Sequence, residues 1–224
     1  ARHRPRPFAP PTAHPAHSQR EACRSAAADS ERESVLGPLQ AAVDAHTAEV
    51  VELLPTLVKQ EKSALVLFTS WRQLNAVVKA LPGQVTEEIL IQGESAKQVL
   101  IRTHRERIDA GEHSTLIGLA SFSEGLDLPG DYCRHVIISK LPFSVPDDPI
   151  DQAMAEWAEA RGRNAFYEIS VPDAALKLIQ ACGRLIRHEE DYGRITMLDK
   201  RIVTQRYGQA LLDSLPPFKR DLAN

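Results

Sequence analysis

The stretch SALVLFTSWRQLNAVVKALPG, residues 63–83, sets the expected fold class. It opens with a continuous apolar run of strand length that ends in hydroxyl side chains. Residues 71–81 then place apolar side chains at helical spacing, and the pattern stops at Pro82-Gly83. A buried apolar strand followed directly by an amphipathic helix is typical of an α/β fold built on a parallel sheet.

The same alternation continues along the chain. Further apolar runs of strand length follow, EEILIQG, TLIGLASF, HVIISKLPF and RITMLDKR, with helical patterns between and around them. In the pattern SAKQVLIRTHRERIDAGEHS, Ser95 is the expected N-cap and Gly111 the expected stop. We predict a parallel sheet with helices on both faces, right-handed crossovers, and ligand-binding groups at the carboxyl ends of the strands.

Residues 1–45 have a different composition from the rest of the chain. Prolines, arginines, alanines, histidines and serines dominate there, and hydrophobic periodicity is absent. We predict a disordered N-terminal extension over residues 1–45 and one folded domain over residues 46–220. No lysine precedes Lys59 and no isoleucine precedes Ile89. This bias supports a second hypothesis, that the extension is read from a wrong frame or start and is not native.

The bulk composition excludes several classes of protein. The chain has 224 residues, of which 43% are hydrophobic and 25% charged, and this is typical of a water-soluble globular protein. Its net charge of -3 means that any nucleic-acid contact must come from a local patch. No apolar run could span a bilayer and no signal peptide opens the chain, so we expect no membrane partner and a cytoplasmic location. The sparse cysteines, Cys23, Cys133 and Cys182, provide no metal or iron–sulfur framework.

The stretch QACGRLIRHEEDYG, residues 180–193, carries a polar set within an apolar helix pattern. Gln180, Arg184 and Arg187 are spaced i, i+4, i+7, so we expect them on one helix face. Two guanidinium forks beside an amide could bind phosphate oxygens. Gly183 in a helix interior costs about 1 kcal/mol relative to alanine, which a close approach of backbone or ligand would explain. The alternative is a solvated helix face paired with neighbouring acids.

A second polar group follows the predicted strand TLIGLASF. In ASFSEGLDLPG, residues 120–130, the candidates are Ser121, Glu124, Gly125 and Asp127. Gly125 permits a positive φ or a close backbone approach, and the carboxylates could receive an arginine or place a metal-bound water. The alternative is ordinary turn chemistry, because such residues are common in loops.

A third group ends the first strand. In LVLFTSW, Thr69 and Ser70 precede Trp71 and Arg72, and together they could hold a phosphodiester backbone. The alternative, compatible with the first, is that Thr69 or Ser70 caps the next helix.

These stretches, taken in order, resemble a known family. LVLFTSW, LIGLASFSEGLDLPGD, VIISKLPFSVPDDP and LIQACGRLIRHEEDYGRITMLDKR resemble motifs IV, V and VI of superfamily-two helicases. More narrowly, they resemble the DinG branch of the XPD-like iron–sulfur helicases, and YGQALLDSLPPF resembles that branch's C-terminus. The resemblance covers about residues 46–220.

The resemblance implies a second RecA-like motor domain, with ATP and Mg²⁺ bound in the cleft between two such domains. It places the motif VI residues at the γ-phosphate, with the arginines as fingers in phosphoryl transfer. It links motif V to the nucleotide site and motif IV to single-stranded DNA. The implied catalytic residues are Gln180, Arg184 and Arg187; the implied cofactor-binding residues are Glu124, Gly125, Asp127 and Gly183; and the implied nucleic-acid-binding residues are Thr69, Ser70, Trp71, Arg72 and Ser121.

The sequence also departs from the family pattern. It contains no Gly-Lys dipeptide and therefore no Walker A loop, no Asp-Glu dipeptide, and no four-cysteine cluster. All of these belong to the family's first motor domain, which could carry an iron–sulfur cluster. We therefore expect half a motor, inactive as an ATPase alone. Its expected partners are the N-terminal motor domain of the same protein and single-stranded or forked DNA, within a bacterial nucleoid.

Two alternatives remain at this point. One is a related motor, either an RNA or R-loop translocase or a translocase linked to a nuclease module. The other is a catalytically inert domain that binds nucleic acid or a partner.

Overall fold

The computed structural model describes residues 43–144, 149–185 and 191–222. The chain divides into two compact units, Ala1–His46 and Thr47–Asn224. The predicted N-terminal extension therefore lies outside the described residues, apart from residues 43–45, and its disorder stays a prediction. The second unit carries the sheet and the described candidate residues.

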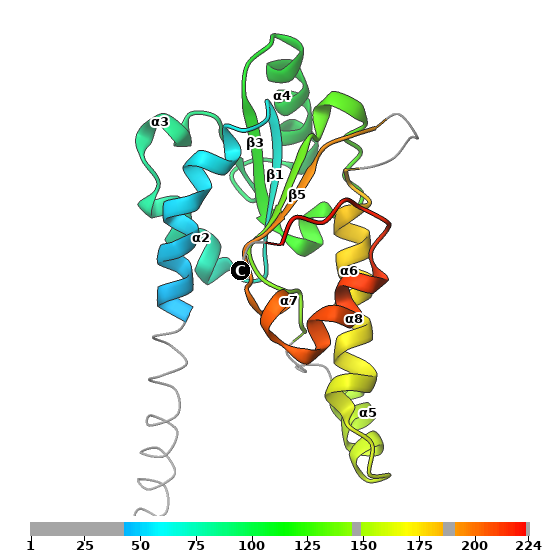
Figure 1. The fold of residues 1–224 in the computed structure, drawn as a ribbon. Helices are drawn as coiled ribbons and strands as arrows, with labels where there is room; N and C mark the ends of the chain where they lie inside the picture. Colours follow the sequence, from blue (N-terminus) through cyan, green and yellow to red (C-terminus); the bar gives the residue numbers. More distant parts are fainter. Residues whose placement is uncertain (1–42, 145–148, 186–190, 223–224) are drawn as a thin grey trace, which may run out of the picture. The chain divides into compact units, whose positions relative to one another are not determined.

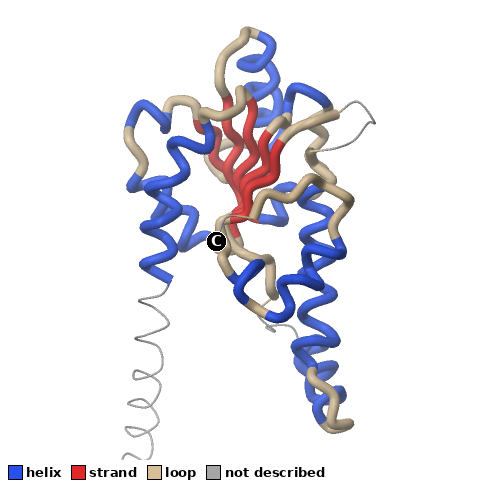
Figure 2. Tube along the Cα trace, viewed as in Figure 1, coloured by secondary structure: helices blue, strands red, loops and turns tan. Residues whose placement is uncertain are grey.

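Among the described residues, five parallel strands form one sheet in the order β2-β3-β1-β4-β5 (Figures 1 and 2). The strands are β1 (Ser63–Phe68), β2 (Ile89–Ile91), β3 (Ser114–Leu119), β4 (His135–Ile138) and β5 (Arg194–Met197). β1 is central, because Leu65 pairs with Leu116 of β3 and with Val136 of β4. The predicted parallel sheet is confirmed, and every strand overlaps one of the predicted apolar runs.

Helices precede the first strand, connect most of the strands and follow the last one. Residues 47–58 are helical and precede β1. The named helices are α2 (Trp71–Ala80), α3 (Gly83–Thr86), α4 (Lys97–Asp109), α5 (Pro149–Glu159), α6 (Val171–Cys182), α7 (Arg201–Thr204) and α8 (Arg206–Ser214), with 3₁₀ turns η1 (Ala120–Ser123) and η2 (Gly130–Tyr132) and the π-helix η3 (Phe166–Ser170). None of the helices in the described ranges is long and apolar enough to cross a membrane.

The sheet is covered on both faces, as predicted. Successive strand residues point to opposite faces, so each face of β1 has its own core. Leu65 and Leu67 join a core cluster with buried residues of α4, α6 and α8. Val66 and Phe68 join the cluster that contains the helix at 47–58 and α2. All six residues of β1 are buried, which explains why this strand reads as a continuous apolar run.

Two helix ends differ from the sequence prediction. α4 begins after Ala96 and not after Ser95, and no side chain caps it. Its end is as predicted, since Gly111 adopts a φ of 81° and donates its N–H to Ile108. The pattern around residues 174–187 predicted one helix, but α6 ends at Cys182.

The connections that leave the neighbouring strands β1 and β4 run to opposite edges of the sheet. From β1 the chain runs through α2 to β2 at one edge of the sheet, and from β4 it runs through α5 and α6 to β5 at the other edge. In open parallel sheets, ligands bind outside the carboxyl ends of strands where the connections diverge. The ends of β1 and β4 therefore define where a site is expected.

Candidate functional site

Polar residues follow the carboxyl ends of the strands at this edge. Thr69 and Ser70 follow β1, Ser121 lies in η1 directly after β3, and Lys140 follows β4 closely. Because the strands are parallel, these ends lie along one edge of the sheet. The fold therefore brings the motif IV and motif V segments to the same side of the domain.

α6 ends before it reaches all the residues of the polar helical face that the sequence predicted. Gly183 is the C-cap, and its N–H donates to Ile179 O at 2.9 Å. The N–H of Arg184 then bonds three residues back, to Ala181 O at 3.1 Å, in the tighter 3₁₀ pattern. The regular helix that the i, i+4, i+7 spacing requires therefore does not continue to Arg184. Gln180 is exposed on the last turn of α6, and Arg187 lies outside the described residues.

Arg184 is joined to the motif V loop. Its Nη1 atom donates to the carbonyl oxygen of Leu126 at 3.2 Å, and the guanidinium is partly buried there. The acceptor in this bond is a backbone oxygen of the loop, and the Arg184 side chain is only partly exposed. The loop receives an arginine, as predicted. The arginine binds a backbone carbonyl, whereas the sequence suggested a carboxylate.

The loop itself is amphipathic. Phe122, Leu126 and Leu128 are buried in the core cluster next to α6, with 1 to 4% of their surface exposed. Between them, Glu124 and Asp127 are exposed. Gly125 adopts a φ of 68°, a left-handed conformation that residues with a Cβ rarely adopt. The three buried side chains fix the loop, and the glycine turn presents the carboxylates to solvent.

Two cations from α4 hold the same loop. Lys97 Nζ donates to the carbonyl oxygen of Glu124, and Arg105 Nη2 donates to that of Asp127. Arg105 also lies 3.6 Å from the Asp127 carboxylate. With Arg184, three charged side chains therefore donate to carbonyl groups within four consecutive residues of the loop. The loop is held from α4 and from the end of α6 at once.

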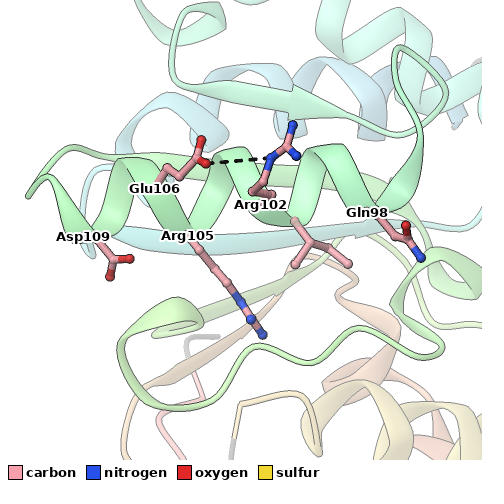
Figure 3. A pocket seen from close by; sticks show the side chains of 6 residues that line it. Gln98, Arg102, Arg105, Glu106 and Asp109 are labelled. Atoms are coloured by element: carbon pink, nitrogen blue, oxygen red, sulfur yellow. Dashed lines mark ion pairs between the residues drawn. The ribbon is translucent and has the colours of Figure 1, made fainter.

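Sequence reasoning missed Lys97 and Arg105. Their helix also carries Arg102, which pairs with exposed Glu106 at 3.8 Å, and nothing in the spacing separates these basic residues. Figure 3 shows Arg105 pointing from α4 toward the loop and away from the Arg102–Glu106 pair. The pocket of about 290 Å³ in that view is lined by α4 alone, and it is not at the carboxyl edge of the sheet.

In the motif IV segment the predicted helix cap is confirmed, and the contact with nucleic acid stays a prediction. Ser70 is the N-cap of α2, and its side chain accepts from the Gln73 N–H at 3.4 Å. Thr69 and Arg72 are exposed, and 43% of the Trp71 surface is exposed. A Cβ added to Gly93, just after β2, would lie 3.6 Å from the Trp71 ring. The indole thus spans the carboxyl ends of β1 and β2, with a face open to solvent.

An ion pair between a buried carboxylate and a half-exposed arginine follows β5. Asp199 is 4% exposed and accepts from the Leu141 N–H at 2.9 Å and from Arg201 Nη2 at 2.6 Å. Burial opposes ionisation of Asp199, but its hydrogen bonds to Arg201 and Leu141 hold the pKa of this carboxyl below its ordinary value. Burial, followed by the charge of Arg201, lowers the pKa of Lys140. The sequence marked these residues only as polar strand ends.

Known families and structures match this fold and these segments. Residues 53–218 match the family model described as "Helicase C-terminal domain". The chain is 47% identical over 185 residues to the "ATP-dependent DNA helicase DinG" of Photobacterium profundum, covering 81% of this chain and 27% of that protein. It is 38% identical over 175 residues to the protein of the same name from Escherichia coli K12, covering 77% of this chain and 24% of that protein. The chain thus spans about a quarter of the length of these curated relatives.

Solved structures support the fold. An XPD helicase structure superimposes with a TM-score of 0.56 at 20% identity, over 75% of this chain and 30% of that one. The structure of Xpd4 from S. tokodaii gives a TM-score of 0.54 at 20% identity, over 76% of this chain and 33% of that one. At this identity the likeness concerns the fold alone, and it identifies the sheet as the RecA-like kind found in these helicases.

Proposed function

Because the chain belongs to the helicase C-terminal domain family, we propose that it is the second motor domain of an ATP-dependent DNA helicase of the DinG type. In this proposal a first motor domain of the same protein supplies the Walker A lysine, and the two domains share ATP and Mg²⁺. The substrate is single-stranded or forked DNA. The names of the similar proteins and the motif order support this assignment.

The hydrogen bond from Arg184 to Leu126 carries the mechanistic part of the proposal. It connects the motif VI segment, which belongs at the nucleotide, to the motif V loop, which belongs between nucleotide and DNA. A guanidinium donates more strongly to an anionic phosphate oxygen than to a neutral carbonyl. Arg184 would therefore donate to a γ-phosphate in preference to Leu126 O, and its bond to Leu126 would re-form once that phosphate is lost.

The residues at the end of α6 suit a phosphate. Gln180 is exposed there, and Arg184 presents planar donors only four residues later. Arg187 belongs to the same donor set, although it lies outside the described residues. When bound, ATP supplies the transferred phosphoryl group. The residues of this chain orient that group and stabilise its developing charge.

The described residues do not form a magnesium site by themselves. In the described ranges, no group of three or more His, Cys, Asp and Glu side chains gathers as metal ligands. The exposed Glu124 and Asp127 lie on the loop without such a group. In this proposal the Mg²⁺ that accompanies the shared ATP is held by ligands of the first motor domain.

Lys97 and Arg105 give the loop a second support during the exchange. When Arg184 leaves, its bond to Leu126 O is lost, but the carbonyls of Glu124 and Asp127 keep their donors from α4. The loop can then respond to the nucleotide without losing its fold. This arrangement is suited to passing a small displacement from the nucleotide toward the DNA track.

The proposed DNA track begins at the motif IV segment. Trp71 offers an exposed indole on which a base can stack, and Arg72 and the hydroxyls of Thr69 and Ser121 are exposed for phosphate contacts. These side chains follow β1 and β3, which are neighbours in the sheet. Binding through stacking and phosphates is salt-dependent and largely independent of sequence.

An ATPase assay tests the proposal. A protein that joins this chain to a first motor domain is expected to hydrolyse ATP when single-stranded DNA is added. Arg184→Ala should lower that rate about 100-fold or more, as loss of a transition-state donor does. Arg102→Ala is the matched control, because Arg102 is exposed and pairs only with Glu106 across one helix turn. DNA-stimulated turnover by the 224-residue chain alone, abolished by Arg187→Ala, would contradict the proposed division of labour.

A further inference from the structure

The side chain of Gln92 continues the pairing of β2 with β3 after β2 has ended. Its main-chain N–H donates to Ile117 O at 2.8 Å, as in a parallel ladder. β2 itself ends at Ile91, and the chain turns at Gly93, which adopts a φ of 96°. The next donor of β3, the Leu119 N–H, bonds to a side chain, Gln92 Oε1, at 2.7 Å. A side-chain amide thus takes the place of the next strand carbonyl.

Gly118 leaves room for this amide. A Cβ added to Gly118 would lie 2.8 Å from Gln92 Oε1 and 2.6 Å from the Phe122 ring, which is closer than real Cβ atoms come to other atoms. A glycine within a strand often marks such a close approach. Phe122 is a buried residue of η1, in the motif V loop. The Gln92 amide and the Phe122 ring therefore pack on one glycine, where the loop leaves β3.

The residue after Gln92 lies next to the Trp71 indole. A Cβ added to Gly93 would be 3.6 Å from the Trp71 ring, which is ordinary van der Waals contact. The indole keeps 43% of the Trp71 surface open to solvent. Gln92 and Gly93, which we name the β2 corner, thus adjoin the proposed base-stacking residue on one side. On the other side they adjoin Leu119, the residue directly before the motif V loop.

The β2 corner holds a part of the loop that the cations do not hold. Lys97, Arg105 and Arg184 donate to carbonyl groups of residues 124–127. Gln92 binds the backbone where the loop begins, and it binds from the side of the motif IV segment. The loop is therefore fixed at its start by the corner next to Trp71 and further along by the residue proposed to bind phosphate. Contiguous packing and hydrogen bonds of this kind can carry energetic coupling between two sites.

We propose that Gln92 is a positioning residue that couples DNA bound at Trp71 to the motif V loop. The proposal rests on the proposed function and deepens it, because it names the route by which DNA stimulates hydrolysis. A base stacked on the indole fixes the ring against Gly93, and the Gln92 amide in turn fixes the start of the loop. The equilibrium that this contact biases is that of Arg184, bonded either to Leu126 O or to the γ-phosphate.

DNA-stimulated ATP hydrolysis by the protein that joins this chain to a first motor domain tests the proposal. Gln92→Leu keeps the side-chain volume but removes the acceptor, and kcat at saturating oligothymidylate should fall about tenfold. Gln92→Glu keeps an oxygen for the Leu119 N–H and loses only the amide donor. Its kcat should stay within about twofold of the wild type, while its charge raises the DNA concentration needed for half-maximal stimulation. Gln98→Leu is the matched control, because Gln98 is an exposed glutamine on α4.

Hydrogen exchange at the Leu119 amide of the 224-residue chain provides a second readout. Exchange should become about fivefold faster in Gln92→Leu and stay near the wild-type rate in Gln92→Glu. Gln92→Asn, whose side chain is one methylene too short to make this bond, replaces the leucine variant in both measurements if that variant does not fold.

The outcomes separate this inference from the proposed function. If Gln92→Leu frees the Leu119 amide but keeps the wild-type kcat at saturating DNA, the bond is structural only and the inference is overturned, while the proposed function stands. If Gln92→Glu loses as much kcat as Gln92→Leu, the lost amide donor is responsible and positioning through Leu119 is again overturned. If DNA does not stimulate the wild-type protein at all, the proposed function is overturned together with this inference.

Discussion

The guanidinium of Arg184 donates to the carbonyl oxygen of Leu126 at 3.2 Å, and this bond joins the end of α6 to the loop between β3 and β4. The two residues are 58 positions apart in the chain. The side chain of Leu126 is buried in the core, so the position of this loop residue is fixed by packing as well as by this bond. A change at the end of α6, where we propose that phosphate binds, would therefore act directly on the loop backbone.

Arg184→Met should loosen the loop without unfolding the domain. A hydrogen bond from a charged donor contributes about 1.5 kcal/mol, and partial exposure reduces this figure. We expect hydrogen exchange at the Leu126 amide, which donates to Ser123 O at 3.1 Å, to become about tenfold faster. Arg102→Met serves as the control. Unchanged exchange at this amide in the Arg184 variant would contradict the proposed coupling.

Gly125→Ala should destabilise the domain through the backbone alone. A Cβ at Gly125 would meet no atom within 4 Å, but the φ of 68° is unfavourable for alanine. We expect a loss of about 1 kcal/mol in the free energy of unfolding, measured by urea denaturation. Gly83→Ala is the control, because that position is also open and lies in helical α3. An equal effect of both substitutions would show that the left-handed conformation is not required.

The stability of the domain should fall in mild acid because of buried histidines. Burial lowers the pKa of His135 from 6.5 to about 4, although Thr196 Oγ1 lies 2.8 Å from its Nε2. The folded state favours the neutral ring, so the unfolded chain binds more protons below pH 6.5. The stabilisation that comes from keeping this ring neutral is fully present above pH 6.5. The free energy of unfolding then falls by about 3 kcal/mol as the pH approaches 4.

Urea unfolding at neutral pH and at mildly acidic pH measures this loss. His104 adds to it in the same direction, since burial also lowers the pKa of that ring. His135→Gln should reduce the difference in unfolding free energy between the two pH values. If the variant loses the same unfolding free energy between the two pH values as the wild type, the effect belongs to other groups.

Trp71→Ala should weaken the binding of single-stranded DNA by the 224-residue chain. Loss of one stacked base corresponds to about a tenfold rise in Kd, and Trp71→Phe should recover most of it. Ser70, the N-cap of α2, is unaffected by either change, so the helix should persist in circular dichroism spectra. Equal binding by the alanine variant and the wild type would remove Trp71 from the proposed track.

The regular elements could be predicted because each is specified locally. The runs around Leu65, Leu116 and Val136 are apolar on both faces. This pattern is typical of a strand in a sheet whose two faces are both covered. The helix ends were less predictable. α6 ends at Cys182 because Gly183 caps it and the last turn tightens, and periodicity alone does not contain this information.

The candidate site was predictable only in part. Motif order marked Arg184 and the loop around Gly125, and the carboxylates of the loop suggested that it receives an arginine, which it does at the carbonyl of Leu126. The motifs did not mark Lys97 or Arg105, because a basic residue on a helix usually faces solvent. They also did not mark Gln92, whose side chain binds the end of β3 only when β2 and β3 are paired.

The sequence by itself determined the alternation of strands and helices, and with it the parallel sheet whose carboxyl edge carries the polar motif segments. These features follow from short-range periodicity and from the backbone preferences of residues such as Gly125. Only the tertiary structure decided which donors reach which carbonyls, because contacts such as Arg184 to Leu126 depend on how separate elements pack. Packing, which acts between residues distant in the chain, is what turned a set of motifs into one connected site.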